Sequence, residues 1–247
     1  MTMLIYTCIE NNYCSLPAEM PPGHEYVCFG DAEAVGPWKV YPSVDCGHPV
    51  RTSRYYKINC PFDGPSIYCD ATRLHLLNET FFDLSEVIFE SEKMFCLQHP
   101  HRHSYLNECM EYYRKGWVDY DSIMRFTNHL KSLDFDFTDW FSPLNTILWR
   151  NDEQEFNENW WELYMKGGIR DQVSYGATLS LMDKDFVYDY SLEFLNHFTD
   201  AGYQGKWWDI RQGDYKYHKP SNESQLLSEL CIMTGLSRFR YKPCCRV

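Results

Sequence analysis

Short apolar runs separated by turn-forming residues dominate the first part of the chain. Strands are predicted at Met3–Ile9, Tyr26–Phe29, Trp38–Tyr41 and Ile67–Cys69. Each run is bounded by residues such as Asn, Pro, Gly or Asp, which are typical of loops and turns. Arg51–Ile58 has helical propensity and precedes the strong turn signal of Cys60–Pro65. Leu84–Phe89 fits a helix or a crossover connection, and Glu92–Leu97 fits a further strand.

After His103 the apolar spacing changes to the helical period. A helix is predicted from Leu106 to Trp117, with Leu106, Met110, Tyr113 and Trp117 on one apolar face. A second begins at Asp121, with Asp119 and Asp121 as candidate caps and Ile123, Phe126 and Leu130 on its core face. Further helices are predicted at Asn151–Met165, Arg170–Met182 and Ser221–Thr234, and a strand at Thr146–Trp149. Strands that alternate with helices indicate an α/β fold, with a mostly parallel sheet flanked by helices. The chain contains no Pro-, Gly- or Ser-rich linker and no repeat, so a single domain over residues 1–247 is expected.

Composition and charge narrow the function classes. The formal net charge of −12 disfavours general binding to nucleic-acid backbones, although cations concentrated in the first half leave a local basic groove open. The eleven cysteines include no CxxC pair, which argues against a zinc ribbon. The apolar run at the N-terminus is short and lacks a basic flank, and no run reaches membrane-spanning length. We therefore expect a cytoplasmic protein with reduced thiols and no membrane span.

Two predicted strands end at single aspartates, which is where open α/β sheets bind ligands. Asp70 follows Ile67–Cys69 and is a candidate ligand for a divalent metal such as Mn²⁺ or Mg²⁺. Arg54 and Lys57 lie shortly upstream and are candidates to bind phosphate. Asp31 ends another strand and is placed to accept a hydrogen bond from a base or ribose. The alternative for both aspartates is an ordinary turn residue.

Three later segments also carry candidate chemistry. His99 and Arg102 belong to a dense imidazole cluster that is suited to phosphate binding or to positioning an acceptor hydroxyl; the alternative is a solvent-exposed loop. Asp171 and Gln172 open a helix, so Asp171 is either a capping residue or a carboxylate that contacts an acceptor or a sugar. His218–Lys219 is suited to complete a metal site and to neutralise a leaving diphosphate; the alternative is a surface loop.

The order and spacing of these pieces resemble a glycosyltransferase-like domain family. This family was first catalogued as a domain of unknown function, and it occurs in plant proteins linked to mucilage polysaccharide synthesis and in bacterial and viral proteins. The matching motifs are Ile5–Thr7, Phe29–Asp31, Ser53–Lys57, Ser66–Asp70, His99–Arg102 with Glu108, and Arg170–Gln172. The resemblance runs from about Ile5 to about Met182, with a looser tail to His218.

The resemblance implies a GT-A type, Rossmann-like fold and a nucleotide-sugar donor such as a UDP-sugar. It implies a nucleotide-sugar-binding part at about 1–100 and an acceptor side at about 101–247. The donor-binding residues implied are Thr7, Asp31, Arg54, Lys57, Asp70, Arg102 and Lys219, the metal ligands are Asp70 and His218, and the catalytic residues are Asp171, Gln172 and His99. Asp70 is all that remains of the DxD motif of the family, because Cys69 precedes it and Ala71 follows it.

Several functions are compatible with these residues. The first is transfer of a hexosyl or pentosyl group to a hydroxyl of a glycan or small molecule. In an inverting reaction Asp171 would be the base, and in a retaining one Asp171 or Gln172 would face the sugar. The second is the same chemistry on modified bases of viral DNA, in the cytoplasm of a host. The third is a metal-dependent hydrolase, which the absence of HExxH and GxSxG motifs disfavours. The fourth is a non-catalytic sugar-binding module.

Overall fold

Contacts within the chain group it into two compact units. The computed structural model describes residues 1–90, 94–95, 97–99, 104–140, 143–151, 153–167, 170–182, 186–187 and 222–236. The first unit contains Met1–Leu97, Asn145–Asn157 and a short strand at Phe186–Val187. The second contains Gln98–Leu144, Glu158–Lys184 and a helix at Glu223–Thr234. None of the helices in these described ranges is both long enough and apolar enough to cross a bilayer.

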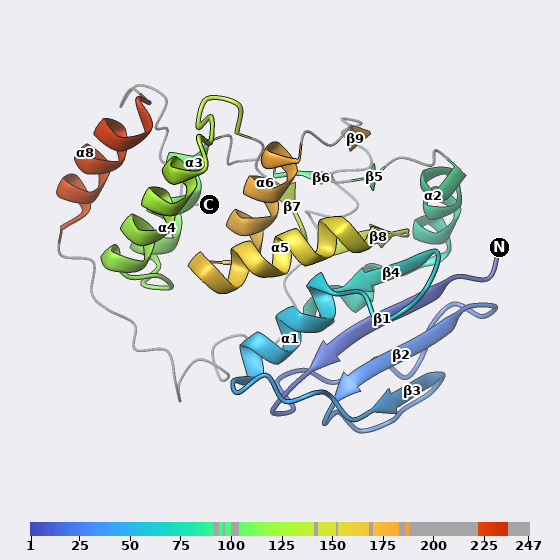
Figure 1. The fold of residues 1–247 in the computed structure, drawn as a ribbon. Helices are drawn as coiled ribbons and strands as arrows, with labels where there is room; N and C mark the ends of the chain where they lie inside the picture. Colours follow the sequence, from blue (N-terminus) through green and yellow to red (C-terminus); the bar gives the residue numbers. More distant parts are fainter. Residues whose placement is uncertain are drawn as a thin grey trace. The chain divides into compact units, whose positions relative to one another are not determined.

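The first unit is built on a five-stranded mixed sheet (Figure 1). Its strands, in spatial order, are β3 (Trp38–Tyr41), β2 (Glu25–Gly30), β1 (Leu4–Ile9), β4 (Ser66–Cys69) and β8 (Ile147–Arg150). The first four are parallel, and β8 runs antiparallel to β4. The predicted α/β class and mostly parallel sheet are therefore confirmed, and each of these five strands lies within a residue or so of its predicted position.

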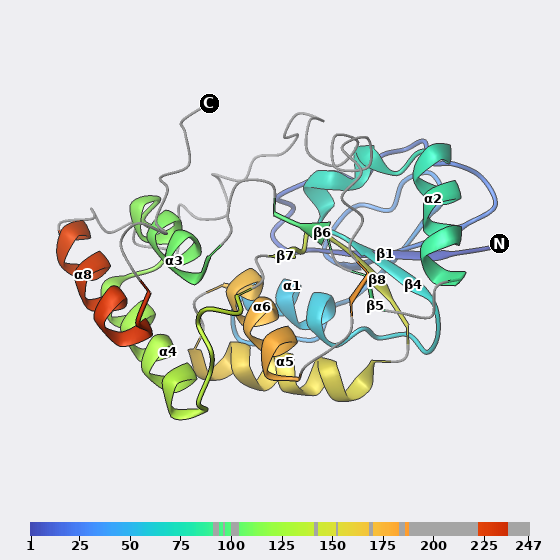
Figure 2. The same cartoon turned by 90° about the horizontal axis from the view of Figure 1, so that it is seen from above.

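Helices pack on both faces of this sheet (Figure 2). Phe29 of β2 stacks on Tyr56 of α1 (Pro49–Ile58), with ring centroids 4.1 Å apart. Trp149 of β8 stacks on Phe81 of α2 (Glu79–Glu90) and donates its indole N–H to Ser85 at 2.8 Å. Successive residues of a strand point to opposite faces of the sheet. The register across β2, β1, β4 and β8 places Phe29 and Trp149 on opposite faces, so α1 and α2 lie on opposite sides.

The order of the strands creates a topological switch point between β1 and β4. From β1 the chain proceeds outward to β2 and β3, and it then returns through α1 to β4 on the other side of β1. Connections leaving the carboxyl ends of β1 and β4 therefore diverge. A crevice at such a point is the general ligand position in open α/β sheets.

The described part of the second unit is mainly helical. Its helices are α3 (Tyr105–Arg114), α4 (Tyr120–Ser132), α6 (Asp171–Leu181) and α8 (Glu223–Thr234), and α5 (Gln154–Gly167) lies mostly in it. Ile123, Phe126 and Leu130, the predicted apolar face of α4, are fully buried in its core. Asp119 caps α4 by accepting from the Ser122 amide at 2.6 Å, as predicted.

Some sequence-based boundaries differ from the structure. Trp117 lies beyond α3, because α3 ends at Arg114 and Gly116 adopts a left-handed conformation with φ of 67°. Leu84–Phe89 belongs to helix α2. Within the predicted strand Glu92–Leu97, the described residues form two short strands instead, β5 (Met94–Phe95) and β6 (Leu97–Gln98). These pair with β9 (Phe186–Val187) and β7 (Pro143–Leu144), respectively.

Candidate functional site

The switch point of the first unit brings together several polar side chains from separate segments. Asp70 directly follows β4, and Lys57 and Arg54 come from the crossover helix α1. The loop that follows β1 lies beside this position, since the Cys14 thiol is 3.6 Å from the carbonyl oxygen of Ala71. Three of the residues predicted to bind a donor, Arg54, Lys57 and Asp70, thus belong to one neighbourhood.

The carboxylate of Asp70 is not used by the turn in which it lies. Its backbone N–H donates to the Thr146 carbonyl at 2.8 Å, and its carbonyl accepts from the Arg73 amide at 2.7 Å. The bond from Arg73 starts the short 3₁₀ helix Ala71–Leu76, but the Asp70 side chain makes no capping hydrogen bond there. The turn therefore does not account for the acidic side chain at this position.

Asp70 instead forms a cluster with a buried lysine and a tyrosine. The Lys57 ammonium lies 3.2 and 3.4 Å from the two carboxylate oxygens of Asp70, and the Tyr68 hydroxyl donates to Oδ1 at 3.0 Å. Lys57 also lies over the Tyr68 ring, 5.4 Å from its centroid. The Lys57 side chain is 1% exposed and that of Asp70 is 17% exposed. A cation buried this far needs its counter-charge, so each member fixes the other.

Arg54 and Tyr13 extend this Lys57–Tyr68–Asp70 cluster. Arg54 precedes Lys57 by three residues on α1, which places both on one face of the helix. Burial raises the pKa of the Tyr13 and Tyr68 phenols well above its usual range; the Asp70 charge raises it further, and the Arg54 charge opposes this. Both phenols therefore stay protonated at neutral pH and act as hydrogen-bond donors.

A buried arginine holds the end of helix α1 that carries Lys57. The Arg150 guanidinium donates to the Ile58 carbonyl at 2.9 Å and also bonds the side-chain oxygen of Asn157. Arg150 ends the apolar strand β8 and is 1% exposed. Sequence analysis missed both Arg150 and Tyr68. The available signal for Arg150 was a lone charge at the end of an apolar strand.

Asp31 lies at the carboxyl end of β2 and holds a loop. Its two carboxylate oxygens accept from the backbone amides of Asn11 and Asn12, at 2.9 and 3.0 Å. Both asparagines have positive φ, of 58° and 48°, so these bonds stabilise an unusual backbone. Gly30 precedes Asp31 with φ of 119°, and a Cβ there would lie 1.8 Å from the Ile9 carbonyl oxygen. A contact of Asp31 with a base or ribose stays a prediction.

Thr7 lies inside the sheet. It pairs with Cys28 of β2 and is fully buried, and its hydroxyl has no hydrogen-bond partner among the described residues. Its predicted contact with a donor is untested by this arrangement.

The predicted acceptor-side residues belong to the second unit. The Gln172 amide donates to Glu108 at 3.1 Å and accepts from the Tyr112 hydroxyl at 3.0 Å. Asp171 is the buried first residue of α6, and its carbonyl accepts from the Trp160 indole at 3.2 Å. His99 is half-buried. Arg102, His218 and Lys219 lie outside the described residues, so their predicted functions stay predictions.

The partners of Gln172 form a polar cluster that sequence reasoning found only in part. Glu108 is fully buried near the start of α3, and the Arg170 guanidinium lies 5.4 Å from the Tyr112 ring centroid and 4.8 Å from that of Trp117. Glu108 and Arg170 belong to the motifs that carry the family resemblance, whereas Trp117 was predicted only on an apolar helix face and Tyr112 was not a candidate. Their stacking on a cation depends on tertiary contacts that the helical period does not encode.

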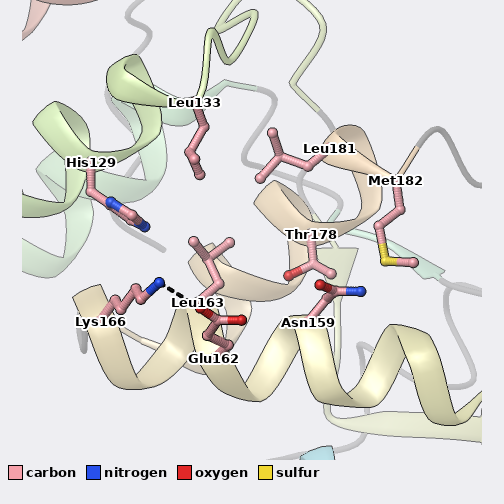
Figure 3. A pocket seen from close by; sticks show the side chains of 9 residues that line it. All are labelled: His129, Leu133, Asn159, Glu162, Leu163, Lys166, Thr178, Leu181 and Met182. Atoms are coloured by element: carbon pink, nitrogen blue, oxygen red, sulfur yellow. Dashed lines mark hydrogen bonds and ion pairs between the residues drawn. The ribbon is translucent and has the colours of Figure 1, made fainter.

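A separate cavity of about 260 Å³ lies among α4, α5 and α6 in the second unit (Figure 3). Leu133, Leu163, Leu181 and Met182 give it an apolar lining, and His129, Asn159, Glu162, Lys166 and Thr178 complete it. Lys166 pairs with Glu162 one turn earlier on α5 at 2.5 Å. None of the predicted site residues lines this cavity. The predicted site residues of the first unit lie instead at its strand ends and on α1.

The described residues do not by themselves fit a divalent-cation site. Among them, no group of three or more His, Cys, Asp or Glu side chains gathers at one point. Both oxygens of Asp70, the predicted metal ligand, already face the Lys57 ammonium. The second predicted ligand, His218, is outside the described ranges.

Comparison of the whole sequence with family models and with curated proteins found no match.

Proposed function

We propose that the first unit binds the diphosphate of a nucleotide sugar at the switch point and that the protein transfers the sugar to a hydroxyl acceptor. The observation that carries this proposal is the Lys57–Asp70 pair at the carboxyl end of β4, with Arg54 on the same helix. A diphosphate is a strong anion, and binding it requires fixed cations and hydrogen-bond donors. The resemblance described above supplies the donor class and a GT-A type fold for the sheet.

The reaction is a substitution at the anomeric carbon of the donor. The acceptor hydroxyl gives its proton to a base, and its oxygen forms a bond to that carbon. The bond from the carbon to the diphosphate oxygen breaks, and its electron pair leaves with the nucleoside diphosphate. Asp171 is the candidate base for an inverting reaction, and Asp171 or Gln172 would face the sugar in a retaining one.

Residues of the first unit would stabilise the charge that develops on the leaving diphosphate. Arg54 is half-buried and therefore reachable, and a guanidinium can donate two parallel hydrogen bonds to phosphate oxygens. Lys57 neutralises Asp70, which removes the repulsion that a bare carboxylate would exert on the diphosphate. No step is assigned to a metal ion, because the described donors do not fit one.

The test is a thermal-shift screen of the full chain against nucleoside diphosphates and nucleotide sugars, with and without Mn²⁺ or Mg²⁺. A ligand that binds only the folded state raises the melting temperature. At one hundred times its Kd, such a ligand adds about 2.7 kcal/mol to the free energy of unfolding. We expect one nucleotide to stabilise the protein and Asp70→Ala to remove this effect, because the substitution leaves the buried Lys57 without its counter-charge and so disrupts the site. Asp63→Ala is the matched control, since Asp63 is an exposed carboxylate in the turn before β4.

The unliganded melting temperature of each variant shows whether it has folded. A screen in which no nucleotide shifts the melting temperature would overturn the proposal and favour the hydrolase or the sugar-binding module. Stabilisation that persists in Asp70→Ala would show that the nucleotide binds at another place on the protein.

A further inference from the structure

We propose that the switch-point site binds its nucleoside diphosphate without a divalent cation. In this assignment Arg54 takes the phosphate charge, and Asp70, neutralised by Lys57, accepts hydrogen bonds from ribose or sugar hydroxyls. The inference rests on the proposed function, because it concerns the same donor site. It departs from the expectation that Asp70 is a ligand for Mn²⁺ or Mg²⁺.

The charge of Asp70 is already balanced by Lys57. The Lys57 ammonium lies 3.2 Å from Oδ1 and 3.4 Å from Oδ2, so both oxygens of the carboxylate face the same cation. A divalent ion on this carboxylate would lie within a few ångströms of that ammonium. Two like charges so close in a partly buried place repel each other strongly. The Lys57 side chain is only 1% exposed, so it cannot turn into solvent to make room for the metal ion.

A metal ion on Asp70 would also need further ligands. Mg²⁺ demands near-octahedral oxygen coordination, with carboxylates as its usual protein ligands. In the described parts of the chain, Asp70 has no companion His, Cys, Asp or Glu side chains gathered as a potential cage. The Tyr68 hydroxyl already donates a hydrogen bond to Oδ1 of Asp70 at 3.0 Å, so it offers that carboxylate a donor and not a further ligand for a cation.

The Asp70 carboxylate keeps room for a further hydrogen-bond donor. Oδ1 already accepts from both Lys57 and the Tyr68 hydroxyl, whereas among the described residues Oδ2 accepts from Lys57 alone. A carboxylate oxygen has two lone pairs, so Oδ2 retains capacity for a hydroxyl donor. Asp70 is also the more exposed member of the pair, at 17%. A neutralised, rigid acceptor of this kind is suited to the hydroxyls of ribose or of a sugar.

The helix that carries Arg54 and Lys57 is held in place before any ligand binds. The turn of α1 that carries Lys57 is fixed by Arg150, whose guanidinium bonds the Ile58 carbonyl at 2.9 Å. Arg54 is on the same helix, one turn earlier. A cation held by a packed helix stabilises a developing charge without having to reorganise, which is what a bound metal ion otherwise provides.

The experiment is isothermal titration calorimetry of the full chain with UDP, GDP, ADP and CDP, each in excess EDTA and again in excess Mn²⁺. We expect the nucleotide that binds to show a Kd that changes by less than about twofold between the two conditions. Arg54→Met should weaken it at least about tenfold, because it removes charge-assisted bonds to phosphate. Lys39→Met, which removes an exposed lysine paired with Glu25 on another strand, should not change it.

Each other outcome is decisive. Binding that requires Mn²⁺ would overturn this inference and leave the proposed function standing. Binding in EDTA that Arg54→Met does not weaken would also overturn it, since the phosphate charge would then be met elsewhere. The absence of binding in both conditions would overturn the inference together with the proposed function. Circular dichroism of each variant checks the fold, and Arg54→Lys, which keeps the charge, should retain part of the affinity.

Discussion

Asp31 and Asp70 occupy equivalent places in the sequence but have different partners in the fold. Each follows a buried strand and begins a loop or turn. Asp31 is exposed, and its carboxylate bonds two backbone amides of the loop after β1. Asp70 leaves its turn uncapped, and its carboxylate bonds a buried ammonium and a phenol. The same local pattern thus yields a backbone clamp in one case and a charge pair in the other.

The partners of a carboxylate indicate whether it stabilises its own loop or is available to a ligand. A carboxylate that satisfies its own loop is explained by local structure. A carboxylate that is turned away from its loop toward a buried lysine is not explained in this way, and it lies at the switch point where ligands bind. Three sets of substitutions test how far this contrast holds, beginning with the largest expected effect.

The residues that precede the two aspartates should differ most. Gly30→Ala should lower the free energy of unfolding by at least about 3 kcal/mol, because φ of 119° is strained for any Cβ and that Cβ would meet the Ile9 carbonyl at 1.8 Å. Cys69→Ala, before Asp70, should cost only about 1–2 kcal/mol for a small buried cavity. Urea unfolding measures both. Equal midpoints for Gly30→Ala and the parent chain would contradict the observed backbone at Gly30.

Breaking the charge pair should have the next largest effect. Lys57→Met should cost about 3 kcal/mol, because it leaves the partly buried Asp70 carboxylate without its cation. A double-mutant cycle with Asp70→Asn, followed by urea unfolding, should give a coupling energy of about 2 kcal/mol. Lys39→Met, at an exposed pair, should cost less than about 1 kcal/mol. A coupling energy near zero would show that Lys57 and Asp70 do not form a pair in solution.

Removing the backbone clamp should have the smallest effect. Asp31→Ala should cost about 1 kcal/mol, because water can replace its bonds to the exposed amides of Asn11 and Asn12. Hydrogen exchange of those two amides should become faster, while exchange within β4 should stay unchanged. A loss as large as that of Lys57→Met would remove the contrast between the two aspartates.

Much of the fold could be predicted from the sequence because its elements obey local rules. The strand Trp38–Tyr41 and the Asp119-capped helix α4 follow directly from apolar spacing and capping chemistry. The antiparallel pairing of β8 with β4 could not be predicted in this way. It joins Tyr68 to Leu148, and no local pattern records a register between segments so far apart.

The candidate site could be predicted only in its residue types. Arg54, Lys57 and Asp70 were identified as candidates from charge and position. Their geometry depends on how α1 packs, since Lys57 reaches Asp70 only when the face of the helix that carries it lies over the end of β4. The sequence gives no hint that the ammonium would be fully buried or that Tyr68 would lie beneath it.

The place of β8 in the sheet has a consequence for biosynthesis. Residues Ile147–Arg150 cover the edge of β4, whose four residues are all buried. During translation β4 leaves the ribosome before Ile147–Arg150 has been synthesised. Until then the backbone groups of Ile67 and Tyr68 on this edge lack their partners in β8. An open apolar edge is a template for pairing with another chain. The nascent protein is therefore most vulnerable to aggregation during this interval, and a fragment that stops before β8 would keep that vulnerability permanently.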